Sequence, residues 1–316
     1  MAGFKVIQPG IYSLLQDAGR FGWHSIGLTT GGPMDQQAFR WANKLCGNND
    51  KSAVIEVTVG GLVLEAECHS SIALTGANMP LTINHKPVPL WQTQRVKPGD
   101  RIELGYANGG SRGYLAVAGG FQAETIFESL ATVPRESLGG LHRDGQPLKA
   151  EDYLPCPQPD PKPPVLRIPD RWRPHHSGTA VLRVILGYQQ DAFTEVQKQL
   201  FFSSEYSLSD SCDRMGYRLN GAPIAPAIGG ILSEGICLGA IQVPADGQPI
   251  ILLRDRQTIG GYPKLGSVLS LDLDRLAQLM PGDKLRFESI SIEQAHNALL
   301  LNAQQCVSAD LEQIHV

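Results

Sequence analysis

Polar side chains follow a purely apolar run, 250–253, in the second half of the chain. Asp255, Gln257 and Thr258 come soon after this run and stand ahead of a glycine pair. Alternate residues of an extended chain point the same way, so we expect Asp255 and Gln257 to face one pocket. A carboxylate there can act as a general base or orient one, and amide and hydroxyl groups can donate hydrogen bonds to a substrate. Together with Arg214, these residues form the predicted catalytic set.

Glycine-rich segments in the same half carry further polar and aromatic groups. Arg214 stands close to Tyr217, while Gln242 and Tyr262 each lie near glycines. Glycine lets the backbone approach a ligand, and arginine or amide groups stabilise developing negative charge. We therefore expect Gln242, Tyr262 and Tyr217 to bind substrate. The alternative for Asp255 is structural, in which it only anchors Arg214 or the neighbouring Arg256.

A second polar cluster lies near the N-terminus, where Asp17, Arg20 and Asp35 stand among glycines. Charged side chains beside an open backbone can bind a ligand through charge-assisted hydrogen bonds. These three residues are accordingly predicted to bind substrate. The alternative is that Asp17 pairs with Arg20 within a turn and that Asp35 caps the helix that follows it.

Many short strands are expected to position these residues. The chain contains 34 glycines and 22 prolines, well above average usage, and few stretches with helical periodicity. Strand-like composition or alternation appears at 53–59, 61–66, 71–74, 81–83, 101–104, 113–117, 181–185, 248–253 and 284–287. This pattern predicts a mainly β fold with a few short helices.

The expected helices are recognised from their ends. Asp35 can cap a helix that stops near Gly47, and Ser291 with Gln294 forms a capping box ahead of another. A third helix is predicted to begin at Asp191.

A proline-rich segment suggests two domains. Eight prolines fall between 155 and 174, where they interrupt helix or sheet and favour an extended spacer. We predict an N-terminal β domain at 1–154, a linker at 155–178 and a C-terminal β domain at 179–316. Both halves contain a Pro-Gly-Asp turn that leads into a strand, at 98–100 and at 281–283.

Charge and motif content exclude several classes of protein. The net charge is -4 with no long block of like charges, which argues against nucleic-acid or membrane partners. The six cysteines form no CxxC pair, and no metal site is predicted. The sequence has no phosphate-binding loop and no apolar run long enough to span a bilayer. We expect a soluble, cytoplasmic protein.

Six ordered motifs resemble one known family along nearly the whole chain. They are Gln16-Asp17-x-Gly19-Arg20, Gly32-Pro33-Met34-Asp35, Tyr114-Leu115-Ala116-Val117-Ala118-Gly119-Gly120, Arg214-Met215-Gly216-Tyr217-Arg218-Leu219, Gly239-x-Ile241-Gln242-Val243-Pro244 and Asp255-x-Gln257-Thr258-x-Gly260-Gly261-Tyr262-Pro263. The family is known as KipA, allophanate hydrolase subunit 2, the biotin-dependent carboxyltransferase-like family or the C subunit of 5-oxoprolinase. The resemblance implies two tandem cyclophilin-like β-barrel units. The chain departs from the family pattern at 128–132 and at 187–189.

The resemblance implies a subunit of an ATP-dependent 5-oxoprolinase, which opens 5-oxoproline to L-glutamate. Its partners would be a homologous, KipI-like B subunit and a lactam-utilisation type A subunit, and its ligand a small lactam or amide. ATP would be used by the complex, with no metal or biotin attached to this chain, and we expect the chain alone to be inactive. Two alternatives stay open: a regulatory protein that antagonises a KipI-like kinase inhibitor, and the carboxyltransferase component of a urea carboxylase or allophanate-type, biotin-dependent system.

Overall fold

The computed structural model describes residues 2–157, 164–176 and 178–314. Contacts divide the chain into two compact units. The first comprises Met1–Phe21, Gly31–His175 and Ala309–Val316, and the second comprises Gly22–Thr30 and His176–Ser308. Residues 158–163 and 177 of the predicted linker, with three of its prolines, lie outside the described part. The mainly β class is confirmed in both units.

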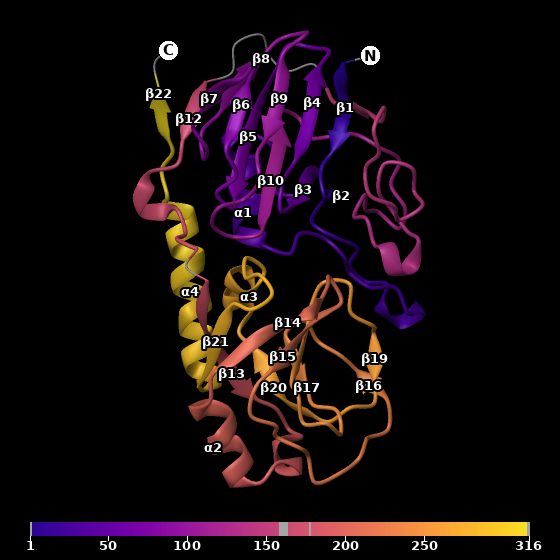
Figure 1. Cartoon of the computed structure of the whole chain (residues 1–316), viewed down its shortest axis with the longest axis vertical. Coiled ribbons are helices and arrows are strands. Elements are labelled where there is room, and N and C mark those ends of the chain that lie inside the picture. The colour runs from indigo at the N-terminus through magenta and orange to yellow at the C-terminus, as the bar shows by residue number, and fades with distance from the viewer. Residues whose placement is uncertain (1, 158–163, 177, 315–316) are drawn as a thin grey trace. The chain divides into compact units, whose positions relative to one another are not determined.

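Two antiparallel sheets form the first unit (Figure 1). The six-stranded sheet has the order β11 (Tyr153–Pro155), β1 (Gly3–Pro9), β4 (Leu62–Ala66), β9 (Arg101–Leu104), β6 (Leu81–Ile83) and β7 (Lys86–Val88). The five-stranded sheet has the order β2 (Tyr12–Gln16), β3 (Val54–Thr58), β10 (Arg112–Val117), β5 (Ser70–Gly76) and β8 (Gln94–Val96). A separate antiparallel pair joins β12 (Val165–Arg167) to β22 (Glu312–Ile314).

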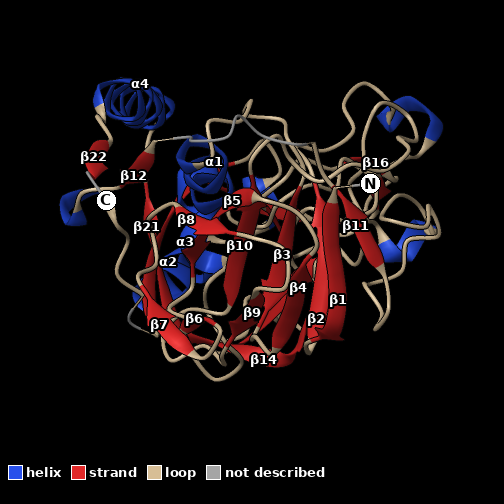
Figure 2. Cartoon of the chain, turned by 90° about the horizontal axis from the view of Figure 1, so that it is seen from above, coloured by secondary structure: helices blue, strands red, loops and turns tan. Residues whose placement is uncertain are grey.

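The five-stranded sheet is buried on both faces. On one face, Ile55, Leu115 and their neighbours join the main core of the unit. On the other face, Tyr114 and Ala116 pack with α1 (Gln36–Leu45), which Figure 2 shows beside β5 and β10. A strand covered on both sides reads as a continuous apolar run, which explains why β10 is recognisable in the sequence.

A closed seven-stranded barrel forms the second unit (Figure 1). Its strands follow the order β13 (Thr179–Leu186), β20 (Lys264–Val268), β17 (Ala240–Gln242), β18 (Ile250–Leu252), β15 (Gly216–Asn220), β14 (Tyr206–Cys212) and β21 (Lys284–Ser289). Only the closing pair, β13 with β21, is parallel. A small ladder of β16 (Glu234–Gly235) and β19 (Ile259–Gly260) completes the strands of the unit.

Helix ends follow the capping rules, with one correction. Asp35 caps α1, and Ser291 with Gln294 caps α4 (Ile292–Ser308), as predicted. The helix predicted to begin at Asp191 is wrong: Gln190–Ala192 is a single 3-10 turn, and α2 (Glu195–Ser203) begins after Thr194. Thr194 and Gln197 satisfy each other's backbone amides in a capping box, which fixes the later start. Among the described residues, the fourth α-helix is α3 (Ser270–Leu276).

The strands predicted from composition are all present, and the two Pro-Gly-Asp turns lead into β9 and β21. Gly99 and Gly282 both have positive φ, 84° and 89°, which only glycine adopts readily. Within the described residues, no helix has the length and apolar character needed to cross a membrane.

Candidate functional site

One wall of the barrel carries two rows of side chains that face opposite ways. Tyr217, Ile251 and Ile241 are paired across β15, β18 and β17, and they are buried. The adjacent row pairs Arg218 with Ile250, and Ile250 with Gln242. Because side chains alternate along a strand, this second row points to the other, outer face of the wall.

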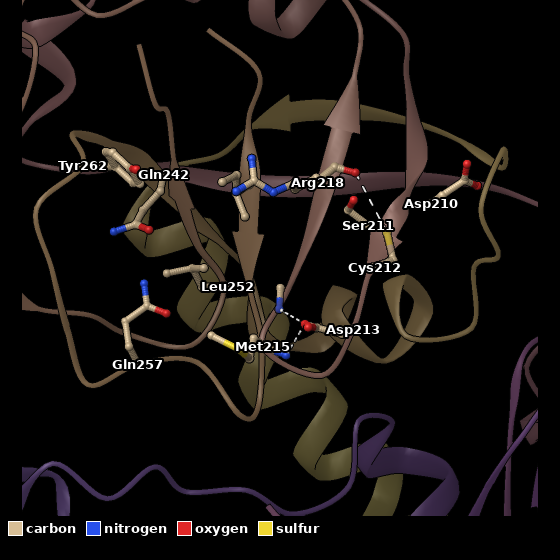
Figure 3. A pocket seen from close by; sticks show the side chains of 12 residues that line it. Asp210, Ser211, Cys212, Asp213, Met215, Arg218, Gln242, Leu252, Gln257 and Tyr262 are labelled. Atoms are coloured by element: carbon tan, nitrogen blue, oxygen red, sulfur yellow. Dashed lines mark hydrogen bonds between the residues drawn. The ribbon is translucent and has the colours of Figure 1, made fainter. Parts of the chain in front are cut away.

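A pocket of about 490 Å³ lies over this outer face. Twelve residues line it, drawn from β14, the turn into β15, β15 itself, β17, β18 and the segment 257–262 (Figure 3). Ile250 and Leu252 supply an apolar surface, while the predicted residues Gln242, Gln257 and Tyr262 supply polar groups. Three residues of the predicted set are therefore brought together in one cavity.

The side-chain amide of Gln242 has a hydrogen-bond donor that no described residue of the protein satisfies. Gln242 is only 1% exposed, yet among the described residues its Nε2 has no hydrogen-bond partner. A buried polar group without a partner costs roughly 1–3 kcal/mol, so each such group in a folded protein calls for an explanation. A bound molecule that accepts from Nε2 would satisfy this group.

Gly260 allows the two amides to come close together. A Cβ atom at this position would lie 2.5 Å from Ile236 Cδ1 and 2.9 Å from Gln242 Nε2, with Gln257 Nε2 at 3.6 Å. Real Cβ atoms do not approach other atoms as closely as the first two distances, and the glycine therefore leaves room for Gln242 and Gln257 at one corner of the pocket.

Asp255 and Arg214 lie elsewhere, in a buried ion pair. Arg214 Nε is 2.9 Å from Asp255 Oδ2, and its Nη2 is 3.0 Å from Oδ1. Neither residue lines the pocket. The expectation that Asp255 and Gln257 face one pocket is wrong, because β18 ends at Leu252 and the chain then turns, so strand alternation no longer applies.

Two other predicted residues serve the framework of the barrel. Tyr217 belongs to the inward row and is 2% exposed. Thr258 does not line the pocket, and its carbonyl accepts a hydrogen bond from the backbone of Ile236. Arg256 donates from Nε to the Ile236 carbonyl at 3.1 Å, and burial lowers the pKa of its guanidinium. These contacts hold the segment before β17 against the segment after β18.

The departure from the family pattern at 187–189 has a structural use. Gln189 Nε2 donates to Glu234 at 2.8 Å, and Gln189 Oε1 accepts from the backbone of Lys264 at 2.9 Å. Lys264 Nζ also pairs with Glu234, and hydrogen bonds from Lys264 and Tyr188 hold the pKa of that carboxyl below its usual value. This cluster ties β16 to the barrel.

The N-terminal cluster organises a loop of the first unit. Asp17 accepts hydrogen bonds from Gly19 N (2.9 Å), Ser129 Oγ (2.6 Å) and Leu130 N (2.6 Å). Arg20, 1% exposed, donates to the carbonyls of Ile126 and Ala131. Asp17 lines a second pocket of about 410 Å³, which Arg20 and Asp35 do not line.

Asp35 has the structural role that the sequence left open. Its Oδ1 accepts from Ala38 N at 2.9 Å, and its own backbone amide donates to Tyr114 Oη at 2.8 Å. Tyr114 in turn donates to Glu56, and burial raises the pKa of its hydroxyl well above the usual value. Asp35 caps α1 and belongs to a buried network.

Arg218 is the residue that sequence reasoning missed. It lines the pocket beside Ile250, although the sequence pattern predicts a functional role only for its neighbours Arg214 and Tyr217. The available signal was the alternation in Tyr217, Arg218 and Leu219, which places Arg218 on the face opposite to the two apolar neighbours. No group of His, Cys, Asp and Glu side chains in the described part of the chain could hold a metal ion.

Comparisons with known proteins agree with the architecture. The family described as "Carboxyltransferase domain, subdomain A and B" matches residues 26–289. The chain is 34% identical to the C subunit of 5-oxoprolinase from Escherichia coli over 301 residues, 93% of each chain. It is also 34% identical to the protein of the same name from Haemophilus influenzae, with 89% of each chain covered. The solved urea carboxylase of Kluyveromyces lactis superposes with a TM-score of 0.90 at 28% identity, and 98% of this chain spans 29% of that structure.

Proposed function

The chain belongs to the carboxyltransferase domain family, subdomains A and B, and from that membership we propose that it is the C subunit of an ATP-dependent 5-oxoprolinase. The observation that carries the proposal is the 34% identity, over 93% of both chains, to the corresponding 5-oxoprolinase protein of Escherichia coli. The match runs along nearly the whole of both chains, so it is not confined to one shared module. The proposed reaction is the opening of 5-oxoproline to L-glutamate.

The outer pocket of the barrel is the proposed substrate site. Resonance stabilises a lactam, so opening its ring requires withdrawal of electron density from the amide carbonyl. Hydrogen-bond donors fixed at the carbonyl oxygen do this, and they act most strongly in a site shielded from water. Gln242, Gln257 and Tyr262 supply such donors, while Ile250 and Leu252 supply contact for ring methylenes.

This chain is proposed to act within a complex in the cytoplasm. Its relatives are themselves named as one subunit of 5-oxoprolinase, which supports the presence of partner subunits. We propose that the partners are a homologous B subunit and a lactam-utilisation type A subunit, and that ATP is a co-substrate of the assembled enzyme. The chain alone is proposed to be inactive, because a composite site needs the groups of every subunit and their contributions to catalysis are strongly non-additive. Partner residues would complete the catalytic groups around the pocket.

A second candidate is a carboxyltransferase component of a biotin-dependent enzyme. The superposition on the Kluyveromyces lactis urea carboxylase, with its TM-score of 0.90, favours it. This chain spans only 29% of that structure, so carboxylation of urea would need further proteins. The nearly full-length match to the 5-oxoprolinase proteins makes the first proposal the stronger one.

Reconstitution tests the proposal. We expect the three co-expressed subunits to release glutamate from 5-oxoproline only when ATP is present, and omission of this chain to abolish the release. Glutamate release by the other two subunits alone would contradict the assignment. Carboxylation of urea after addition of a biotin carboxylase, without opening of 5-oxoproline, would establish the second candidate instead.

A further inference from the structure

The row of Arg218, Ile250 and Gln242 sets the dimensions of the pocket floor. Each residue is paired with the next across neighbouring strands. Adjacent strands lie about 4.8 Å apart, so the Cα atoms of Arg218 and Gln242 are separated by about 10 Å. Both side chains rise from the same face, with the apolar side chain of Ile250 between them. A ligand over Ile250 is within reach of both polar groups.

The two ends of the row offer different chemistry. Arg218 is exposed, and its guanidinium forms no ion pair or hydrogen bond with any described residue. Gln242 is buried, and its amide has unused hydrogen-bonding capacity. One end of the pocket therefore presents a fixed positive charge, and the other presents a neutral amide.

Neither acidic residue of the pocket, Asp210 or Asp213, forms an ion pair with Arg218. Asp213 Oδ1 accepts from the backbone amides of Met215 and Gly216, at 2.7 and 3.1 Å, and is committed to the turn before β15. Asp210 also lines the pocket, but Figure 3 shows it directed away from Arg218, whose guanidinium extends toward Gln242 and Tyr262. The charge of Arg218 is thus available to a ligand.

We infer that this pocket selects a small molecule that carries both a carboxylate and an amide, with Arg218 as the specificity residue. The carboxylate accepts charge-assisted hydrogen bonds from Arg218, and the amide group pairs with Gln242. The atoms between them lie over Ile250 and Leu252. This inference rests on the proposed function, because 5-oxoproline has a carboxylate and a lactam on one five-membered ring. Neutral lactams and urea lack the carboxylate. They would bind without the contact to Arg218, and their affinity for the pocket would therefore be lower.

Direct binding to the full chain is the first test. L-5-oxoproline, neutral 2-pyrrolidinone and cyclopentanecarboxylate are titrated by calorimetry or NMR. The protein is compared with Arg218→Met, which keeps an unbranched side chain without charge, and with Arg218→Lys. The matched control is Arg275→Met, since Arg275 is an exposed arginine on α3 that does not line the pocket.

The expected result is a loss confined to the carboxylate ligands. Arg218→Met should weaken binding of 5-oxoproline about 10- to 100-fold, as for a lost hydrogen bond to a charged group. It should leave 2-pyrrolidinone unchanged, and Arg218→Lys should restore part of the affinity. Equal effects on 2-pyrrolidinone, or no effect on 5-oxoproline, would overturn the inference.

Kinetics of the assembled enzyme separate this inference from the proposed function. If the complex opens 5-oxoproline, Arg218→Met should raise KM at least about 10-fold with kcat nearly unchanged. An unaltered KM would remove Arg218 from recognition and leave the proposed function standing. If the complex does not open 5-oxoproline, the proposed function fails and the titrations decide alone. Arg218-dependent binding would then still support the inference, and absence of binding in both assays would overturn it.

Discussion

Arg214 and Asp255 form a two-point ion pair with both partners buried, at 6% and 2% exposure. The backbone amide of Asp255 also donates to the carbonyl of Arg214 at 2.9 Å, so side chains and main chain join the same two segments. The pair fixes the start of β15 against the turn that follows β18. Through that turn it sets where Gln257 enters the pocket.

Asp255→Asn should destabilise the protein strongly while the remaining folded protein keeps its activity. The change leaves the buried Arg214 without its counter-charge, which costs about 3–5 kcal/mol. Thermal unfolding and the specific activity of the assembled enzyme should be measured on the same preparation. Asp191→Asn, at an exposed position, is the control and should melt normally. A normal melting temperature with a loss of turnover of about 10²-fold would restore Asp255 as a catalytic base.

Gln242→Leu should lower the activity of the assembled enzyme without lowering the stability of the protein, which is the reverse of the result expected for Asp255→Asn. The wild-type amide is buried with an unpartnered Nε2 among the described residues, so an apolar replacement should leave the melting temperature equal or higher. The kcat/KM of the assembled enzyme for 5-oxoproline should fall at least about 10-fold, because a donor to the substrate is lost. Calorimetry and steady-state kinetics measure the two effects. A large drop in melting temperature with unchanged kcat/KM would show that the amide only supports the fold.

Gly260→Ala should close one corner of the pocket. The added methyl group would meet Ile236 Cδ1 at 2.5 Å and Gln242 Nε2 at 2.9 Å. Forcing these groups apart should cost about 1–3 kcal/mol of stability and lower kcat/KM about 10- to 100-fold. Gly229→Ala is the matched control, since a Cβ there has no neighbour within 4 Å, and it should change neither quantity. Equal behaviour of the two variants would argue that the corner does not bind substrate.

Asp17→Asn should loosen the loop that Asp17 organises. Its two oxygens accept three hydrogen bonds, and an Asn amide would direct a donor at one of these donors. The expected loss is about 1–3 kcal/mol in the free energy of unfolding, measured by denaturant titration. Asp50→Asn, at an exposed carboxylate, should be neutral. Unchanged stability with a raised KM would instead support the predicted role of Asp17 in substrate binding.

Tyr206 should contribute to alkaline unfolding. Burial raises the pKa of Tyr206 to about 12, above the value of about 10 for an unfolded tyrosine. Its contribution is therefore complete below pH 10 and is lost as the pH rises toward 12, because the unfolded chain releases the proton first. The stability of the wild type relative to Tyr206→Phe should therefore fall as the pH rises from 9 to 12. A constant difference in unfolding free energy from pH 9 to 12 would contradict this assignment.

Local chemistry was sufficient to predict much of the fold. The strands were recognisable because a continuous apolar run or a Pro-Gly turn depends only on residues that are neighbours in the sequence. Examples are β10 and the turn at Gly282. The caps of α1 and α4 were predictable for the same reason. The start of α2 was misplaced because Asp191 and Thr194 both resemble caps, and only the reciprocal bonds of Thr194 with Gln197 distinguish them.

The class of fold, the family and the pocket residues Gln242, Gln257 and Tyr262 could be predicted from the sequence, because each of these three residues lies within a few positions of a glycine in a local polar motif. The surroundings of Asp255 and Arg218 could be known from the tertiary structure alone. Asp255 is paired with a residue 41 positions away, and Arg218 reaches the pocket through its register with Ile250 and Gln242. A carboxylate acts as a base or as an anchor according to which charge lies beside it. That neighbour is set by how the strands of the barrel align.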